Sequence, residues 1–193
     1  MNALSPDDRT AFLEELTPDS INQLLKFLSP TERSVSIKLL GYPENSVGRL
    51  MTPDYIAIKM DWTVREVLDY IRERGKDSET LDVIYAVDDE GRLVDEFHIR
   101  QILLADPATR VRDLGDKQTE ALIVDGDQEA AADLFRKYDR VALPVVDSKG
   151  VLLGIVTIDD ILDVVQEENT EDFQKIGGVM AFKEPYLDIP FFT

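Results

Sequence analysis

The first 45 residues alternate short apolar stretches with polar segments that recur at a fixed interval. These segments begin at Ser5-Pro6, Thr17-Pro18 and Ser29-Pro30, twelve residues apart. Each places a hydroxyl side chain at an N-cap position and a proline at the first helical position, where its missing N–H group costs nothing. The intervening apolar residues recur at helical spacing, as in residues 21–28. The pattern predicts three helices of about two turns each, which look like the end of a longer helical array because such short helices need neighbours.

After a linker rich in breaker residues at 41–46, the hydrophobic pattern of the chain repeats itself. The offset between the two copies falls from 64 to 59 residues, so the first copy holds about five additional residues near 75–79. The matching segments are residues 61–72 with 125–136, residues 87–94 with 146–153, and residues 99–103 with 158–162.

Each copy has the pattern of a strand, a helix, a strand, a tight turn, a strand and a helix. In the second copy we expect strands at residues 121–124, 141–146 and 151–156, and an alanine-rich helix that begins at Asp127. Thr157 is placed to cap a last helix beginning with the next residue. Two such β-α-β-β-α units in tandem form one pseudo-symmetric module with a cleft between them.

The composition excludes several classes of function. The 193 residues are 44% hydrophobic and 31% charged, and the formal net charge of −18 opposes binding to nucleic acid or to anionic lipid. The chain has no cysteine and one histidine, His98, which excludes thiolate zinc sites and disfavours a catalytic triad. No stretch approaches the roughly 18 apolar residues that span a bilayer, and acidic residues stand where a signal peptide is apolar. We therefore expect a cytoplasmic location.

The second repeat carries the motif Gly-Ile-Val-Thr-Ile-Asp-Asp at residues 154–160, preceded by Leu-Pro-Val-Val-Asp at residues 143–147. This motif resembles the G-h-h-T-x-x-D signature of CBS domains. With the segments at residues 48–53, 138–147 and 159–178, the order of motifs resembles the cytosolic region of MgtE-type magnesium channels. In that family a helical N domain precedes a CBS pair, and a connecting helix leads to the membrane pore.

The resemblance implies an α+β/α/β chain with four parts. These are a partial helical N domain at residues 1–45, CBS domain 1 at 46–110, CBS domain 2 at 111–168, and the end of a connecting helix with a tail toward an absent membrane domain at 169–193. It also implies a homodimer formed through the CBS pairs, and a transmembrane pore domain on the same parent chain. This region would then lie on the cytoplasmic side of the cell membrane, with no nucleic-acid partner.

Residues 158–172 carry seven carboxylates and no lysine or arginine. On a helix several of them share a face, where each like-charged pair costs a few tenths of a kcal/mol. A hard cation relieves this repulsion, because Mg²⁺ takes oxygen ligands and typically needs only one or two protein carboxylates. The residues alone leave two interpretations open: a solvated acidic face, or a metal site between facing acidic surfaces. The carboxylates are Asp159, Asp160, Asp163, Glu167, Glu168, Glu171 and Asp172.

The resemblance to MgtE-type sensors favours Mg²⁺ binding and implies which carboxylates take part. Those that match ligands of sites between domains are Glu129, Asp139, Asp160 and Asp163. Those that match the connecting helix and its sites are Glu168, Glu171 and Asp172. Asp159 is a further candidate in the acidic run. Asp7 and Asp8 look like the N-domain counterparts, while Ala11 stands where a further acid is expected.

CBS pairs also bind adenosine nucleotides such as ATP or AMP in the cleft between their repeats. The resemblance places Thr157 at the phosphate and Asp160 at the ribose, with Arg100 as a further phosphate contact. The alternative is that Thr157 is a plain N-cap and Asp160 a first-turn acid. The first repeat departs from the motif, so at most one nucleotide site is expected. Arg140 stands where an aromatic residue would stack on adenine, which disfavours that site.

The function implied is magnesium sensing. When Mg²⁺ is abundant, it neutralises the facing carboxylates, the domains close, and the connecting helices hold the pore shut; when it is scarce, repulsion opens the assembly. We expect no enzyme, because no nucleophile–base pair, phosphate loop or His-rich metal site can be assembled from these residues. The alternative is an adenosine-nucleotide-sensing CBS module that regulates another transporter or an enzyme.

Overall fold

The structure, a computed structural model, describes residues 4–116, 119–138 and 140–166. It confirms the helical N-terminal unit. At the second helix, Thr17 accepts a hydrogen bond from the backbone N–H of Ser20, and at the third, Ser29 and Glu32 form a reciprocal capping box. Ser5 precedes the first helix without a side-chain capping bond. The elements are α1 (Pro6–Glu14), α2 (Pro18–Leu24), the 3-10 turn η1 (Leu25–Phe27) and α3 (Pro30–Leu40).

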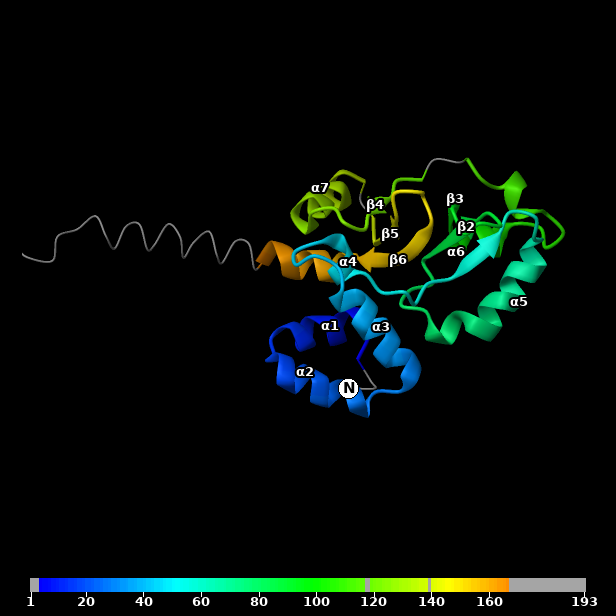
Figure 1. The fold of residues 1–193 in the computed structure, drawn as a ribbon. Coiled ribbons are helices and arrows are strands. Elements are labelled where there is room, and N and C mark those ends of the chain that lie inside the picture. The colour runs from blue at the N-terminus through cyan, green and yellow to red at the C-terminus, as the bar shows by residue number, and fades with distance from the viewer. Residues whose placement is uncertain (1–3, 117–118, 139, 167–193) are drawn as a thin grey trace, which may run out of the picture.

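The two predicted repeats are present in the order expected (Figure 1). The first repeat contains α4 (Val47–Leu50), β1 (Ala57–Lys59), α5 (Val64–Arg74), η2 (Gly75–Asp77), β2 (Val83–Val87), β3 (Leu93–His98), α6 (Ile99–Leu104) and η3 (Val111–Asp113). The second contains β4 (Leu122–Ile123), α7 (Gln128–Tyr138), β5 (Ala142–Val146) and β6 (Leu152–Thr157). A last helix, here called the Ile158 helix, is described from residue 158 to residue 166. The additional residues of the first copy form η2.

Each repeat builds a three-stranded sheet with the same topology. The orders are β1-β2-β3 and β4-β5-β6, with the first pair of strands parallel and the second antiparallel. The tight turns between the antiparallel strands place Gly91 and Gly150 at φ angles of +79° and +80°, which only glycine adopts without strain. The two hairpins are therefore equivalent, as the internal repeat predicts.

The repeats exchange backbone hydrogen bonds across the chain. Thr52, which precedes the first sheet, pairs with Ile155 of β6 through two bonds of 2.9 Å. A Cβ atom at Gly154 would lie 2.7 Å from the Thr52 carbonyl oxygen, so this close approach requires glycine. The N–H groups of Val47 and Gly48 in α4 donate to carbonyls of the second repeat at 2.8 Å. Residues 46–52, which we assigned to CBS domain 1, thus pack on the second repeat.

The N-terminal unit also packs on the second repeat. Leu39 of α3, 1% exposed, belongs to the same buried cluster as Met51, Phe135 and Ile161. In Figure 1 the blue helices lie beneath α4 and the Ile158 helix, while β1–β3 and α5 lie to one side. This packing brings α1 opposite the acidic start of the Ile158 helix. Within the described residues, no helix combines the length and the apolarity needed to cross a bilayer.

Candidate metal centre

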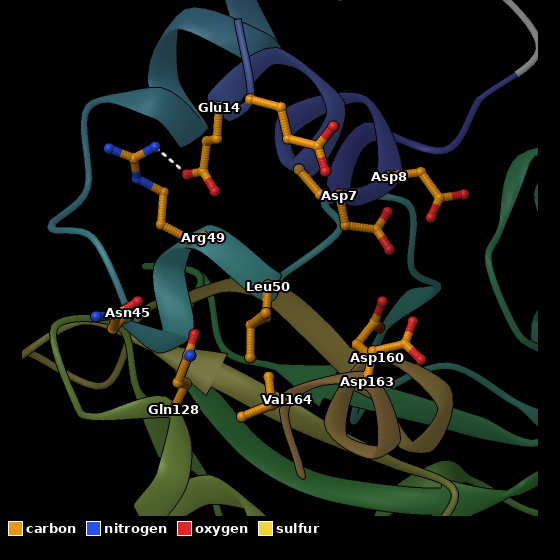
Figure 2. A pocket seen from close by; sticks show the side chains of 12 residues that line it. Asp7, Asp8, Glu14, Asn45, Arg49, Leu50, Gln128, Asp160, Asp163 and Val164 are labelled. Carbon is orange, nitrogen blue, oxygen red and sulfur yellow. Dashed lines mark hydrogen bonds and ion pairs between the residues drawn. The ribbon is translucent and has the colours of Figure 1, made fainter. Parts of the chain in front are cut away.

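A cavity of about 360 Å³ lies where α1, α4 and the Ile158 helix meet (Figure 2). Six carboxylates and a single guanidinium are among the side chains that line it. Its acidic side chains come from two units that are far apart in the sequence, the helical N-terminal unit and the second repeat. The lining residues are Asp7, Asp8, Ala11, Glu14, Glu15, Asn45, Arg49, Leu50, Gln128, Asp160, Asp163 and Val164.

Asp7 is the most deeply placed carboxylate of the N-terminal unit. It lies in the first turn of α1, where the helix dipole favours a negative charge, and its side chain is 7% exposed. Burial raises the pKa of Asp7, and the charge of Asp8 raises it further. The Oδ1 atom of Asp7 is buried and has no hydrogen-bond partner among the described residues. A buried carboxylate oxygen without a partner is costly unless a proton or a cation satisfies it.

Asp160 faces Asp7 from the first turn of the Ile158 helix (Figure 2). Its Oδ2 atom accepts the Thr157 hydroxyl at 2.6 Å and the Thr157 N–H at 3.3 Å. Burial raises the pKa of Asp160 to about 7, the Thr157 hydrogen bonds oppose this shift, and the negative charge of Asp7 adds to it. Two carboxylates from different units therefore share a desolvated space, where both cannot be ionised without a large cost.

The remaining predicted ligands divide into three groups. Asp163 and Asp8 are exposed and line the cavity. Asp159 is exposed and is not among its lining residues, and Glu129 is exposed in the first turn of α7. Four predicted ligands lie outside the described residues: Asp139, Glu168, Glu171 and Asp172.

Two carboxylates that the sequence did not single out lie close to Asp7. They are Asp54, ahead of β1, and Glu79, ahead of β2. The pKa of each is raised, mainly by burial and next by the charge of Asp7. The N–H of Glu79 donates to the Asp54 carbonyl at 2.7 Å, which holds the two segments together. Neither lies in a motif, so only the folded arrangement reveals that the charge of Asp7 acts on them.

The arrangement suits a hard divalent cation. The donor set of the cavity is carboxylate oxygen with the amide side chains of Asn45 and Gln128, the chemistry that Mg²⁺ prefers. A cation would also satisfy the unpartnered Oδ1 of Asp7. Within the described residues, no three His, Cys, Asp or Glu side chains are already clustered closely enough to hold an ion.

A second cavity, of about 720 Å³, lies between the repeats. Its lining includes two arginines, Arg100 and Arg140, and one carboxylate, Asp82, so its net charge is positive. Arg140 forms an ion pair with Glu96 of β3, so it links the two repeats. Asp160 is among the residues that line the acidic cavity and is not among those that line this one, whereas Arg100 lines this one.

Two protein-family models match the chain. The CBS domain matches twice, at residues 47–108 and 111–167. The MgtE intracellular N domain matches residues 1–45.

Curated relatives of the chain include magnesium transporters. The chain is 46% identical over 138 residues to the magnesium transporter MgtE of Thermus thermophilus, a match that covers 72% of this chain and 31% of the relative. It is 34% identical over 178 residues to the MgtE of Bacillus subtilis, covering 92% of this chain and 40% of the relative. The chain thus spans less than half the length of these relatives.

Solved structures with the same fold include two from magnesium transport proteins. One is the cytosolic domain of the Mg²⁺ channel MgtE in complex with ATP, with a TM-score of 0.82, 40% identity, and coverage of 84% of this chain and 67% of that chain. The other is the soluble part of a magnesium transporter, with a TM-score of 0.82, 32% identity, and coverage of 86% and 64% respectively.

Proposed function

The chain belongs to the CBS-domain family, in the arrangement of the MgtE magnesium transporters, with an MgtE N domain ahead of a CBS pair, and from this premise we propose that it is the Mg²⁺-sensing regulatory region of such a transporter. The observation that carries the proposal is the pair formed by Asp7 and Asp160 across the cavity. The region has no catalytic task of its own.

The sensing step is a change in how the N-terminal unit sits on the second repeat. With both carboxyls ionised, Asp7 and Asp160 repel each other in a desolvated space, and this favours separation of α1 from the Ile158 helix. Bound Mg²⁺ supplies positive charge that offsets this repulsion. Asp7 and Asp160 would hold the ion, with Asp8 and Asp163 at the exposed rim. The closed and separated arrangements then differ in free energy according to the Mg²⁺ concentration.

The effect on transport would be negative feedback on a pore domain of the same parent chain, with this region on the cytoplasmic side of the membrane. Closure at high Mg²⁺ holds the pore shut through the connecting helix. The candidate ligands Glu129 and Asp139 would belong to further ion sites between domains, and Glu168, Glu171 and Asp172 to sites of the connecting helix. Asp159 would add negative charge nearby.

Dimerisation through the CBS pairs is part of the proposal. Leu103 in α6 and Leu162 in the Ile158 helix occupy equivalent positions of the two repeats, and both are exposed, 61% and 52% respectively. Leu104 beside Leu103 is 76% exposed. Exposed apolar side chains at equivalent positions of both repeats support the proposal that a second copy of the chain covers this face.

The experiment measures the distance between the N-terminal unit and the second repeat as Mg²⁺ is added. Because the chain has no cysteine, Lys26→Cys and Ser148→Cys can carry a pair of fluorophores without background labelling. The labelled chain is diluted with unlabelled chain so that transfer within one copy is measured. We expect a saturable rise in energy transfer with Mg²⁺ at constant ionic strength, and no rise with matched Na⁺.

The control variants separate the cavity from general charge effects. Asp163→Asn removes a carboxylate at the cavity rim, and Asp69→Asn removes one from the exposed face of α5. The first variant should shift the Mg²⁺ concentration at half-closure, and the second should leave it unchanged. Energy transfer that does not respond to Mg²⁺ in the unsubstituted chain would refute the proposed function.

A second candidate is adenosine-nucleotide sensing, favoured by the cationic cavity between the repeats and by the ATP complex of the similar MgtE cytosolic domain. There Arg100 would contact phosphate. Arg140, which the Glu96 carboxylate holds, presents a cation rather than an aromatic ring to a base. Titration with ATP and AMP by calorimetry tests this candidate. Binding that is lost in Arg100→Ala supports it, and heats equal to those of dilution refute it.

A further inference from the structure

Arg49 is the one cation that lines the acidic cavity among the described residues. It belongs to α4, whose Val47 and Gly48 N–H groups bond the second repeat at 2.8 Å, so its backbone is fixed to that repeat. Its Nε atom donates to the Tyr42 carbonyl at 2.6 Å, and its side chain is only 13% exposed. The guanidinium is thus held in place rather than extended into solvent.

The partner of Arg49 lies on the other side of the interface. Its NH1 group forms an ion pair with Glu14, at the C-terminal end of α1 (Figure 2). A carboxylate at a helix C-terminus is disfavoured by the helix dipole, so a nearby cation is needed there more than at the N-terminal end. Asp7 and Asp8 occupy that N-terminal end, where the dipole stabilises them. One end of α1 is therefore repelled by the second repeat, and the other end is attracted to it.

We propose that Arg49 is a positioning residue for metal sensing: its ion pair with Glu14 keeps the C-terminal end of α1 attached to the second repeat when no metal is bound. This inference rests on the proposed metal-dependent closure. The Arg49–Glu14 ion pair acts as a pivot at the C-terminal end of α1. Repulsion between Asp7 and Asp160 then separates only the N-terminal end of α1 from the second repeat. Because the Glu14 carboxylate is paired with Arg49, Glu14 does not act as a metal ligand in this chain.

The proposal makes a prediction opposite to that of simple repulsion. If the six cavity carboxylates acted only through their negative charge, neutralising any of them would close the cavity. The ion pair reverses the effect of charge neutralisation at Glu14. Glu14→Gln should therefore open the metal-free chain, whereas Asp8→Asn should close it. These two variants remove the same charge from the same cavity and from the same helix.

The test uses the Lys26→Cys and Ser148→Cys labels in chelator-containing buffer, without Mg²⁺. We expect Glu14→Gln and Arg49→Met each to raise the open-to-closed ratio by about fivefold, the factor that ~1 kcal/mol from a partly exposed ion pair gives. Arg72→Met removes an arginine that pairs within α5 and should change nothing. The double variant Glu14→Arg with Arg49→Glu restores the pair with exchanged charges and should restore closure.

The outcomes separate this inference from the proposed function. The pivot role of the Arg49–Glu14 pair is refuted if Glu14→Gln closes the metal-free chain as Asp8→Asn does. It is also refuted if Arg49→Met has the same open-to-closed ratio as the unsubstituted chain. In either case the Mg²⁺ response of the unsubstituted chain still stands. If the unsubstituted chain ignores Mg²⁺, the proposed function fails, and the metal-free comparison still decides the role of Arg49. Full closure of Arg49→Met at saturating Mg²⁺ would show that the variant folds and retains its cavity carboxylates.

Discussion

Replacing Asp160 by asparagine tests the electrostatic basis of the acidic cavity. Asparagine keeps the shape of the side chain, and its Oδ1 atom can still accept the Thr157 hydrogen bonds. Its amide group also brings a donor to the cavity, where Asp7 Oδ1 lacks a partner. The substitution therefore removes the negative charge with little loss of packing or hydrogen bonding.

The magnitude follows from the pKa of Asp160, which burial raises from 3.8 to about 7. At ~1.4 kcal/mol per pKa unit, holding this carboxyl ionised in the folded chain costs on the order of 4 kcal/mol at pH 8. Asp7 shares this cost, because its pKa is raised as well. Local relaxation and solvent reduce it, so we expect Asp160→Asn to gain ~2 kcal/mol in free energy of unfolding at pH 8.

The pH dependence has a definite sign. Because the pKa is raised on folding, the folded chain retains the proton more tightly, and stability falls as pH rises from 3.8 through about 7. The advantage of Asp160→Asn should thus be largest at pH 8 and near zero at pH 4. Urea unfolding of both chains at these two pH values, without Mg²⁺, measures it. A gain that is the same at both values, or a loss at pH 8, would refute the reasoning.

Three further predictions concern the cavity and the packing that forms it. Mg²⁺ must displace the Asp160 proton below pH 7, so Mg²⁺ should bind up to about tenfold more weakly at pH 6 than at pH 8, while the metal-free chain, with Asp160 largely neutral, should be more closed at pH 6; calorimetry in two buffers should detect proton release at pH 6, and none there would argue against this site. Leu39→Ala should lower the free energy of unfolding, measured with urea, by ~2–4 kcal/mol. Ile37→Ala on the same helix, where the side chain is 54% exposed, should change it by no more than ~0.5 kcal/mol. Equal effects of the two substitutions would contradict the packing of α3 on the second repeat. Gly154→Ala should cost ~1–3 kcal/mol, because its Cβ would lie 2.7 Å from the Thr52 carbonyl oxygen, and an unchanged melting temperature would show that the close approach is not rigid.

Local signals in the sequence predicted most elements of the fold. The Ser/Thr-Pro starts predicted α1, α2 and α3, and the internal repeat predicted two sheets of like topology. These succeeded because capping, turns and periodicity depend on neighbours within a few residues. The resemblance to MgtE-type sensors, now supported by the family matches, named Asp7 and Asp160 as candidates. The structure places them on one cavity, and their role as ligands stays a prediction.

The rest of the site depends on contacts between distant parts of the chain. Asp54 and Glu79 stand in no motif, and Arg49 lies in the matched segment at residues 48–53 without being singled out there; each is brought to its place by packing that local periodicity does not encode. The packing around the predicted domain boundary at residue 46 likewise depends on contacts between distant parts of the chain. The linker composition located the break in helical pattern, but it could not show that residues 46–52 pack on the second repeat.

The pairing of Thr52 with Ile155 has a consequence for synthesis of the chain. About a hundred residues separate the two partners, so this contact closes a long loop and belongs to the late steps of folding. On the ribosome, the helical N-terminal unit emerges before the two repeats, yet the buried cluster that contains Leu39 is not complete until Val156 and Ile161 have been made. A release of the nascent chain before residue 155 would leave that apolar helix face uncovered, a state that chaperones bind and proteases remove.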